Sequence, residues 1–260
     1  MIVKTIKSAI KARRLNNKIF SEVERAVELN SGKAGPIQLP DMFGRRLPER
    51  VVEMLYAFLS YRPGLRLLDV GCANAMESHL RMIEHLEMPR KIVGIDICSP
   101  TRRTLQVYDD FINASIVSSG IASESFDLIW CISALEHFGM DNTSYTNSFE
   151  LSQNMDVQAV QEMTRLLAVG GRLLITVPYG RYENHVWFRN YNAEFLRRLL
   201  LPVEQSTLAD ISFFRHSHSV GWSAVEQEEL QYIGYYDQAN GGCAGLAVIM
   251  LTKIPTAGAV

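Results

Sequence analysis

Residues 65–83 read LRLLDVGCANAMESHLRMI, and the pattern of this stretch changes in the middle. Its apolar first part predicts a buried strand, and the later apolar residues at helical spacing predict a helix. Asp69 lies near the end of the strand, and Gly71 permits a sharp turn. Ala73 and Ala75 are small enough for a ligand to approach the backbone. We therefore expect a strand–turn–helix unit of the kind that binds nucleotide-like ligands.

Strands and helices alternate along the rest of the chain. Further strands are predicted at 91–97, 104–108, 126–133, 172–178 and 245–253, and helices at 48–61, 156–167 and 192–201. Near-continuous apolar strands separated by helices are typical of a parallel sheet covered on both faces. Ligands bind such sheets beyond the carboxyl ends of the strands. The expected site therefore follows residues 70, 97, 109, 133 and 178.

Composition excludes several classes of protein. The chain has 260 residues, of which 47% are hydrophobic, so it is long enough to bury a large core. Its formal net charge of -2 gives no overall indication of nucleic-acid binding, and a local basic patch stays open. Its four cysteines form no CxxC pair and no metal-ligand spacing, which favours reduced thiols, a cytoplasmic protein and no metal site. No apolar run approaches the roughly 18 residues of a membrane span, and no signal peptide is recognisable.

The N-terminal segment differs from the rest. Its first acidic residue is Glu22, and the preceding basic residues are Lys4, Lys7, Lys11, Arg13, Arg14 and Lys18. Isoleucines at 2, 6 and 10 would form one stripe of a basic amphipathic helix. Such a helix either lies on the inner face of an anionic membrane or packs its isoleucines on the domain. With the Gly- and Pro-rich stretch 30–44, it predicts an N-terminal segment at 1–45 and a main domain at 46–260.

Two classes of ligand bind turns of the kind predicted after residue 70. A nicotinamide dinucleotide fingerprint, G-x-G-x-x-G, would require glycines at 71, 73 and 76, and here only the first is present. The stretch instead resembles the first motif of class I S-adenosylmethionine-dependent methyltransferases, an acidic residue followed by G-x-G-x-G. In this chain that motif stands as Asp69-Val-Gly71-Cys-Ala73-Asn-Ala75.

Later segments resemble the same family in the same order. They are GIDICSP at 94–100, VYDD at 107–110, SESFDLIWCISALEHFG at 123–139 and MTRLLAVGGRLLITVPYG at 163–180. The resemblance implies an α/β, Rossmann-like, seven-stranded and mostly parallel sheet whose last strand is antiparallel, with S-adenosyl-L-methionine as cofactor. Within the family, the chain looks most like methyltransferases of bacterial glycan or polysaccharide assembly.

The resemblance also implies a set of site residues. The donor site would be formed by Asp69, Gly71, Ala73, Asp96, Ile97, Asp110, Phe111 and Ser133. His137 would act as the base that deprotonates a hydroxyl acceptor, and Glu136 would orient it or act as the base itself. Sugar rings stack on aromatic faces and arginine binds anionic groups, so the acceptor would contact Tyr179, Arg181, Trp187 and Arg189.

The favoured function is thus O-methylation of a sugar, glycan or related small molecule. Alternatives are a catalytically silent binding subunit with the same fold, favoured by the alanines at 73 and 75, and a methyltransferase for nitrogen or carbon acceptors. The third alternative is a nicotinamide-dependent oxidoreductase. No nucleic-acid partner is expected.

Overall fold

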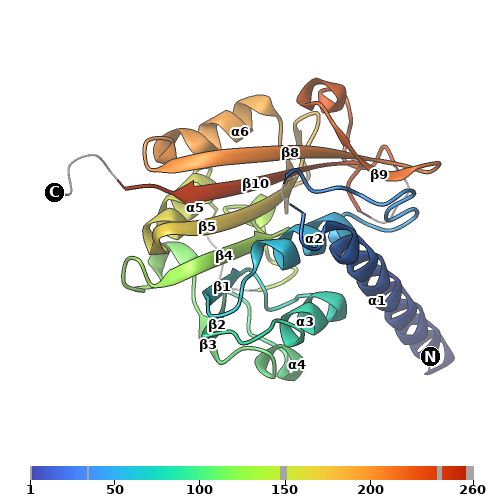
Figure 1. The fold of residues 1–260 in the computed structure, drawn as a ribbon, viewed down its shortest axis with the longest axis horizontal. Helices are drawn as coiled ribbons and strands as arrows, with labels where there is room; N and C mark the ends of the chain where they lie inside the picture. The colour runs from blue at the N-terminus through green and yellow to red at the C-terminus, as the bar shows by residue number, and fades with distance from the viewer. Residues whose placement is uncertain (1, 34, 147–150, 239–241, 256–260) are drawn as a thin grey trace.

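The protein is built around one eight-stranded sheet (Figure 1). The computed structural model describes the chain except residues 1, 34, 147–150, 239–241 and 256–260, and it describes no side chains within 2–9. The strand order is β3-β2-β1-β4-β5-β10-β8-β9. The strands are β1 (Arg66–Val70), β2 (Lys91–Asp96), β3 (Asp110–Asn113), β4 (Phe126–Ile132), β5 (Leu167–Pro178), β8 (Thr207–Ser217), β9 (Gly221–Val225) and β10 (Gly245–Lys253).

Helices and short elements complete the fold. The helices are α1 (Ile2–Asn30), α2 (Arg50–Ser60), α3 (Glu77–Glu84), α4 (Arg102–Leu105), α5 (Met155–Leu166) and α6 (Ala193–Leu200). The 3-10 turns are η1 (Ile116–Ser118), η2 (Leu135–His137), η3 (Leu201–Val203) and η4 (Gln227–Leu230). A small separate hairpin pairs β6 (Glu183–Asn184) with β7 (Arg189–Asn190).

Strand pairing confirms the predicted fold class. Strands β3, β2, β1, β4 and β5 are mutually parallel, whereas β10 runs antiparallel to both β5 and β8. The sheet has one strand more than predicted, because β8 turns back through a hairpin and pairs with β9 from Ser217↔Gly221 onward. Trp222 of β9 is buried and donates a hydrogen bond to the Leu47 carbonyl, which attaches the segment before α2 to this end of the sheet.

The strand predicted at 104–108 is wrong. Residues 102–105 form α4 instead, since the Thr101 side chain caps this helix by accepting a hydrogen bond from the Thr104 N–H at 3.0 Å. The third strand begins only at Asp110. The helix predicted at 192–201 is confirmed as α6, and Asn192 caps it as expected, with its side chain 3.0 Å from the Phe195 nitrogen.

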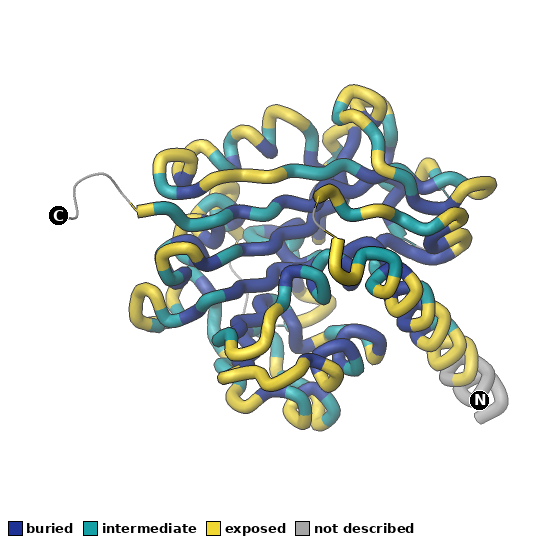
Figure 2. The backbone as a smooth tube through the Cα atoms, viewed as in Figure 1, coloured by how far each residue is buried: buried dark blue, intermediate teal, exposed yellow. Residues whose placement is uncertain are grey.

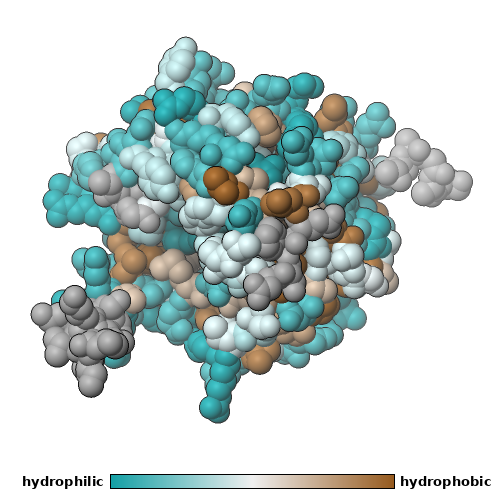
Figure 3. All heavy atoms as spheres, turned by 180° about the vertical axis from the view of Figure 1, so that it is seen from behind, coloured by the Kyte–Doolittle hydropathy of each residue, from teal (hydrophilic) through white to brown (hydrophobic). Residues whose placement is uncertain are grey.

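Alternate side chains of the strands face two separate cores. On one face, Leu67, Leu128 and Leu174 pack with buried residues of α1, α2 and α3. On the other face, the neighbouring Leu68 and Ile129 pack with α5 and α6. Figure 2 shows the strands as the buried layer between exposed helix surfaces. Seen from behind, the surface is mostly hydrophilic, with small separate hydrophobic patches (Figure 3).

The predicted N-terminal helix is present as α1. Its second half is the packed part, where Ile19, Val23 and Ala26 are buried against the domain, while its first turns project from the body in Figure 1. Among the helices that the structure describes, none combines the length and apolarity that crossing a bilayer requires.

The turn after β1 brings two backbones together. Gly71 has a φ of +80°, and a Cβ built on it would lie 2.4 Å from the Ala134 Cβ, after β4. Glycine is therefore required at this position both by conformation and by space.

We expect Gly71→Ala to lower the free energy of unfolding by about 3 kcal/mol, measured by urea denaturation. Gly120→Ala is the matched control, because Gly120 also has a positive φ (+68°) but nothing within 4 Å of its added Cβ. Its cost should be only about 1 kcal/mol. The double variant Gly71→Ala, Ala134→Gly should be more stable than Gly71→Ala alone. Equal losses for Gly71→Ala and Gly120→Ala would contradict the steric contact.

Candidate functional site

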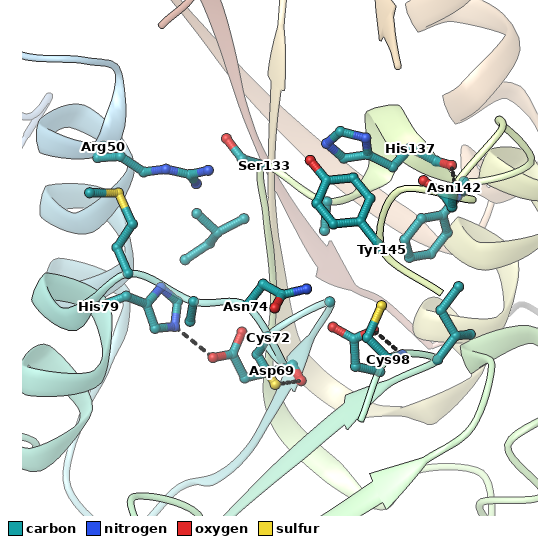
Figure 4. Close-up of a pocket in the computed structure, with 18 of the residues that line it drawn as sticks. Arg50, Asp69, Cys72, Asn74, His79, Cys98, Ser133, His137, Asn142 and Tyr145 are labelled. Carbon is teal, nitrogen blue, oxygen red and sulfur yellow. Dashed lines mark hydrogen bonds and ion pairs between the residues drawn. The ribbon is translucent and has the colours of Figure 1, made fainter. Parts of the chain in front are cut away.

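Two adjoining cavities lie beyond the carboxyl ends of β1, β2 and β4. The first, of about 250 Å³, is shown in Figure 4 and extends from Arg50 of α2 to Tyr145. The second, of about 360 Å³, is lined by Ile95 and residues 114–118. Both include Gly71, Asp96, Ile97, Phe138 and Asn142 in their walls. The two cavities therefore adjoin at these residues, and together they are called the cleft below.

Of the fourteen residues predicted for the site, six line the cleft and a seventh forms a hydrogen bond to one of them. Asp69, Gly71, Asp96, Ile97, Ser133 and His137 line the first cavity, and Ala73 supports it through its backbone N–H, which binds Asp96. Glu136, Asp110, Phe111, Tyr179, Arg181, Trp187 and Arg189 are not among the residues that line either cavity.

The Asp96 carboxylate is held rigidly at the junction of the cavities. One oxygen accepts the Ala73 N–H at 2.8 Å, and the other accepts the Cys98 N–H at 2.8 Å. Burial raises the pKa of Asp96, while these two hydrogen bonds lower it. The turn after β1 and the end of β2 are thus joined through one side chain.

Asp69 is committed to neighbouring side chains. Its Oδ2 atom lies 2.6 Å from His79 Nε2 and accepts the Tyr108 hydroxyl at 2.7 Å. His79, at the start of α3, lines the first cavity and completes a buried Asp–His pair (Figure 4). Sequence reasoning missed this histidine, because nothing in the local pattern indicates that α3 turns it back toward β1.

A second missed group surrounds Glu53 of α2. This carboxylate is fully buried, and its Oε1 accepts hydrogen bonds from Ser133 at 2.5 Å and from Thr176 at 2.8 Å. Its Oε2 pairs with Arg50 at 2.9 Å. Ser133 itself has a positive φ of 42°, which its bond to Glu53 helps to maintain. An acid flanked by apolar residues within the predicted helix 48–61 was the available sequence signal.

His137 is oriented by the loop after β5. Its Nδ1 lies 2.8 Å from the Trp187 carbonyl oxygen, so the neutral ring donates from Nδ1 and carries its lone pair on Nε2. The indole of Trp187 stacks on the imidazole at 5.1 Å, and Tyr145 lies 5.9 Å away on another side. Burial lowers the pKa of His137. The ring is therefore mostly neutral at pH 7.

Burial shifts the pKa of the neighbouring Glu136 in the direction opposite to that of His137. It is buried, its Oε2 has no hydrogen-bond partner among the described residues, and its Oε1 is 4.0 Å from His137 Nε2. Burial raises its pKa to about 8. A carboxyl that keeps its proton to this pH is a hydrogen-bond donor rather than a base near neutrality.

Asp110 and Phe111 lie away from the cleft because β3 starts with them. Asp110 is exposed and pairs with Lys91 at 3.8 Å, and the Phe111 ring lies where a side chain on Gly94 would point. The carboxyl end of β3 is Asn113, whose amide donates to the carbonyl oxygens of Asp96, Ile97 and Cys98. The residues that reach the second cavity are thus those after Asn113.

Three of the four predicted acceptor residues are engaged elsewhere. Arg189 is buried, pairs with Asp156 at 2.8 Å and donates to the Phe138 carbonyl. Arg181 is exposed and pairs with Glu183, while the Tyr179 hydroxyl accepts from Gln227. All three follow β5 as predicted, but their polar groups are used in contacts within the protein, and of the three only Arg189 belongs to the β6–β7 hairpin. Trp187 alone lies beside His137.

The sheet order, the glycine turn and the cleft define a Rossmann-like fold whose cavities lie beyond the carboxyl ends of the parallel strands, where such folds bind ligands. Residues 68–175 match a family model described as a methyltransferase domain. Comparison with curated protein sequences gives no match.

Solved structures share the fold over most of the chain. The Burkholderia thailandensis 1,6-didemethyltoxoflavin-N1-methyltransferase, solved with 1,6-didemethyltoxoflavin and S-adenosylhomocysteine, is 15% identical with a TM-score of 0.50, over 95% of this chain and 90% of that one. An Archaeoglobus fulgidus SAM-dependent methyltransferase is 13% identical with a TM-score of 0.51, over 80% and 96%. The [4+2]-cyclase SpnF is 17% identical with a TM-score of 0.51, over 82% and 85%.

The predicted class I methyltransferase fold is therefore confirmed. The matched domain model supports the predicted cofactor, S-adenosylmethionine, and the Burkholderia thailandensis neighbour of the same fold was solved with S-adenosylhomocysteine.

The raised pKa of Glu136 predicts a pH-dependent effect on stability. The folded state retains a proton that the unfolded chain releases above its usual pKa of 4.5, so Glu136 costs stability progressively as pH rises from 4.5 to about 8. Glu136→Gln should match the wild type at about pH 5 and exceed it by on the order of a few kcal/mol above about pH 8.

Urea unfolding at both pH values measures this difference. Glu49, whose pKa burial raises to about 7, titrates in both proteins. The exposed Glu228→Gln variant is the control and should show no such pH dependence. A Glu136→Gln variant with the same advantage at both pH values would contradict the assigned protonation.

Proposed function

We propose that this protein transfers a methyl group from S-adenosylmethionine to a hydroxyl of a sugar, glycan or related small molecule. The observation that carries the proposal is that His137 lines the first cavity while its Nδ1–H is used by the Trp187 carbonyl, which leaves the lone pair on Nε2. A neutral imidazole beside the place where donor and acceptor meet is suited to accept the hydroxyl proton.

The shape and charge of the cleft fit the proposed donor. Its two lobes suit an adenosine part and an amino-acid part, and the Asp96 carboxylate at their junction suits ribose hydroxyls. Residues 114–118 and Ile97 would contact the adenine. Arg50 lines the other lobe and would pair with the donor's carboxylate. The first cavity is present with alanines at 73 and 75, and Ala75 forms part of its wall.

Bound S-adenosylmethionine supplies a methyl group already activated by its sulfonium. What the chain supplies is position and proton transfer. The walls formed by Ser133, His137 and Tyr145 restrict the acceptor to one side of the first cavity. Glu136 in its protonated state keeps a negative charge away from His137, and this favours the neutral imidazole that acts as base.

The acceptor class is supported by the aromatic side chains at this end of the cleft. Trp187 is 37% exposed and Tyr145 46% exposed, their ring centroids lie 5.9 Å apart, and both flank His137. Partly exposed aromatic faces of this kind bind the apolar face of a sugar ring. A hydroxyl of such a ring would then lie near Nε2.

The fold by itself allows other chemistry, since SpnF is described as a cyclase. A silent binding subunit or a nitrogen or carbon methyltransferase therefore stays the alternative to this proposal. Calorimetry with S-adenosylhomocysteine separates a silent subunit that binds no donor from an enzyme. Labelled S-adenosylmethionine, incubated with cell extracts and followed by identification of the labelled product, gives the acceptor and the methylated atom.

For the donor, we expect Asp96→Asn to weaken S-adenosylhomocysteine binding at least tenfold in titration calorimetry, because a charge-assisted hydrogen bond to the ribose is lost. The control is Asp110→Asn, which removes an exposed carboxylate outside the cleft and should leave the affinity unchanged. Equal affinities for both variants would show that Asp96 does not hold the donor.

For catalysis, we expect His137→Ala to lower methyl transfer at least 100-fold while S-adenosylhomocysteine binding stays within about twofold. His218→Ala removes an exposed histidine and should retain full activity. In the wild type, kcat/KM should fall only below pH 6.5, because burial lowers the pKa of His137 and protonation removes the base. Unchanged turnover of His137→Ala would refute the role of base.

A further inference from the structure

A basic groove lies on the outer side of α1. It is lined by Lys11, Arg14 and Lys18 of the helix, by Arg46 of the following loop, and by the apolar residues Ile10, Leu15 and Leu47. The three helix cations are spaced by three and four residues, so they occupy one face of α1. The groove therefore combines four cations with an apolar floor.

The charges of the groove are not neutralised by the protein. Within the part of the chain that the structure describes, none of the four cations forms an ion pair, and all four are exposed. Glu22, the first acidic residue of the chain, already pairs with Arg25 at 2.8 Å. A protein with a net charge of -2 thus concentrates uncompensated positive charge at one place.

We propose that this groove docks the protein on an anionic membrane surface, with lipid phosphates on Lys11, Arg14, Lys18 and Arg46. The apolar component favours a bilayer over a purely polyanionic partner, since Ile10 is 47% exposed beside these cations. A helix with basic and apolar residues together lies at the headgroup boundary, where both find their preferred surroundings.

The position of the groove links the docking surface to the cleft. Figure 1 shows α1 projecting on the side opposite the C-terminal end of β10. Because β5 runs antiparallel to β10, this is the side where β5 ends. Asn16 lies next to Leu15 and accepts the Ser78 N–H at 2.8 Å, and Ser78 lines the first cavity. A docked protein would hold its cleft close to the bilayer, which, if the proposed function holds, suits an acceptor linked to a lipid.

The test uses the full chain and sedimentation with vesicles of phosphatidylcholine, with or without phosphatidylglycerol. The wild type should bind only the anionic vesicles, and high salt should release it. The triple variant Lys11→Gln, Arg14→Gln, Lys18→Gln should partition about 100-fold more weakly. The exposed triple Arg90→Gln, Arg102→Gln, Arg197→Gln removes the same charge elsewhere and should bind as the wild type does.

Circular dichroism melting of both triple variants confirms that they fold. Ile10→Asn should also weaken vesicle binding, because it removes apolar contact without changing charge. The proposal is overturned if the wild type ignores anionic vesicles, if the α1 triple variant binds as well as its control, or if the chain binds duplex DNA and not the vesicles.

Discussion

The hydrogen bond from the Ala73 N–H to the Asp96 carboxylate holds together the part of the molecule on which the cleft depends. It ties the turn after β1 to the end of β2 at the point where the two cavities meet. The turn itself exists because Gly71 adopts a positive φ and carries no side chain against Ala134. The positive φ of Gly71, its close approach to Ala134 and the Asp96 carboxylate thus act at the same turn, and the rest of the cleft is arranged around it.

Buried charge is the second organising feature. Glu53 is paired with Arg50 and bound by two hydroxyls, so α2 is attached to the ends of β4 and β5. Glu136 has no such partners, and burial instead keeps it neutral. Buried carboxyl groups either acquire partners or keep their proton, because an unpaired charge in a low-dielectric interior is costly. In this protein Glu53 has acquired partners, whereas Glu136 keeps its proton.

The N-terminal helix belongs to the domain as well as to its surface. Its second half fills one core with Ile19 and Val23, and Asn16 binds the start of α3. Its basic first half projects away from this packing. These buried residues lie beyond the isoleucine stripe of the sequence: Ile10 is 47% exposed, and the side chains of Ile2 and Ile6 lie outside those that the structure describes. The exposed basic part is where the proposed membrane contact would lie.

Local patterns were enough to predict the sheet class, the turn at Gly71, the cap at Asn192 and the places of Asp96 and His137, because hydrophobic periodicity and turn chemistry act between near neighbours. They misplaced the third strand, where the Thr101 cap favours a helix. They also assigned Arg189 to the acceptor site, although Asp156, distant in sequence, binds it in the interior. Which side chains line a cleft depends on contacts between distant segments, as His79 with Asp69 and Glu53 with Ser133 show. Those contacts form only when the sheet brings the segments together, so the tertiary structure alone determined them.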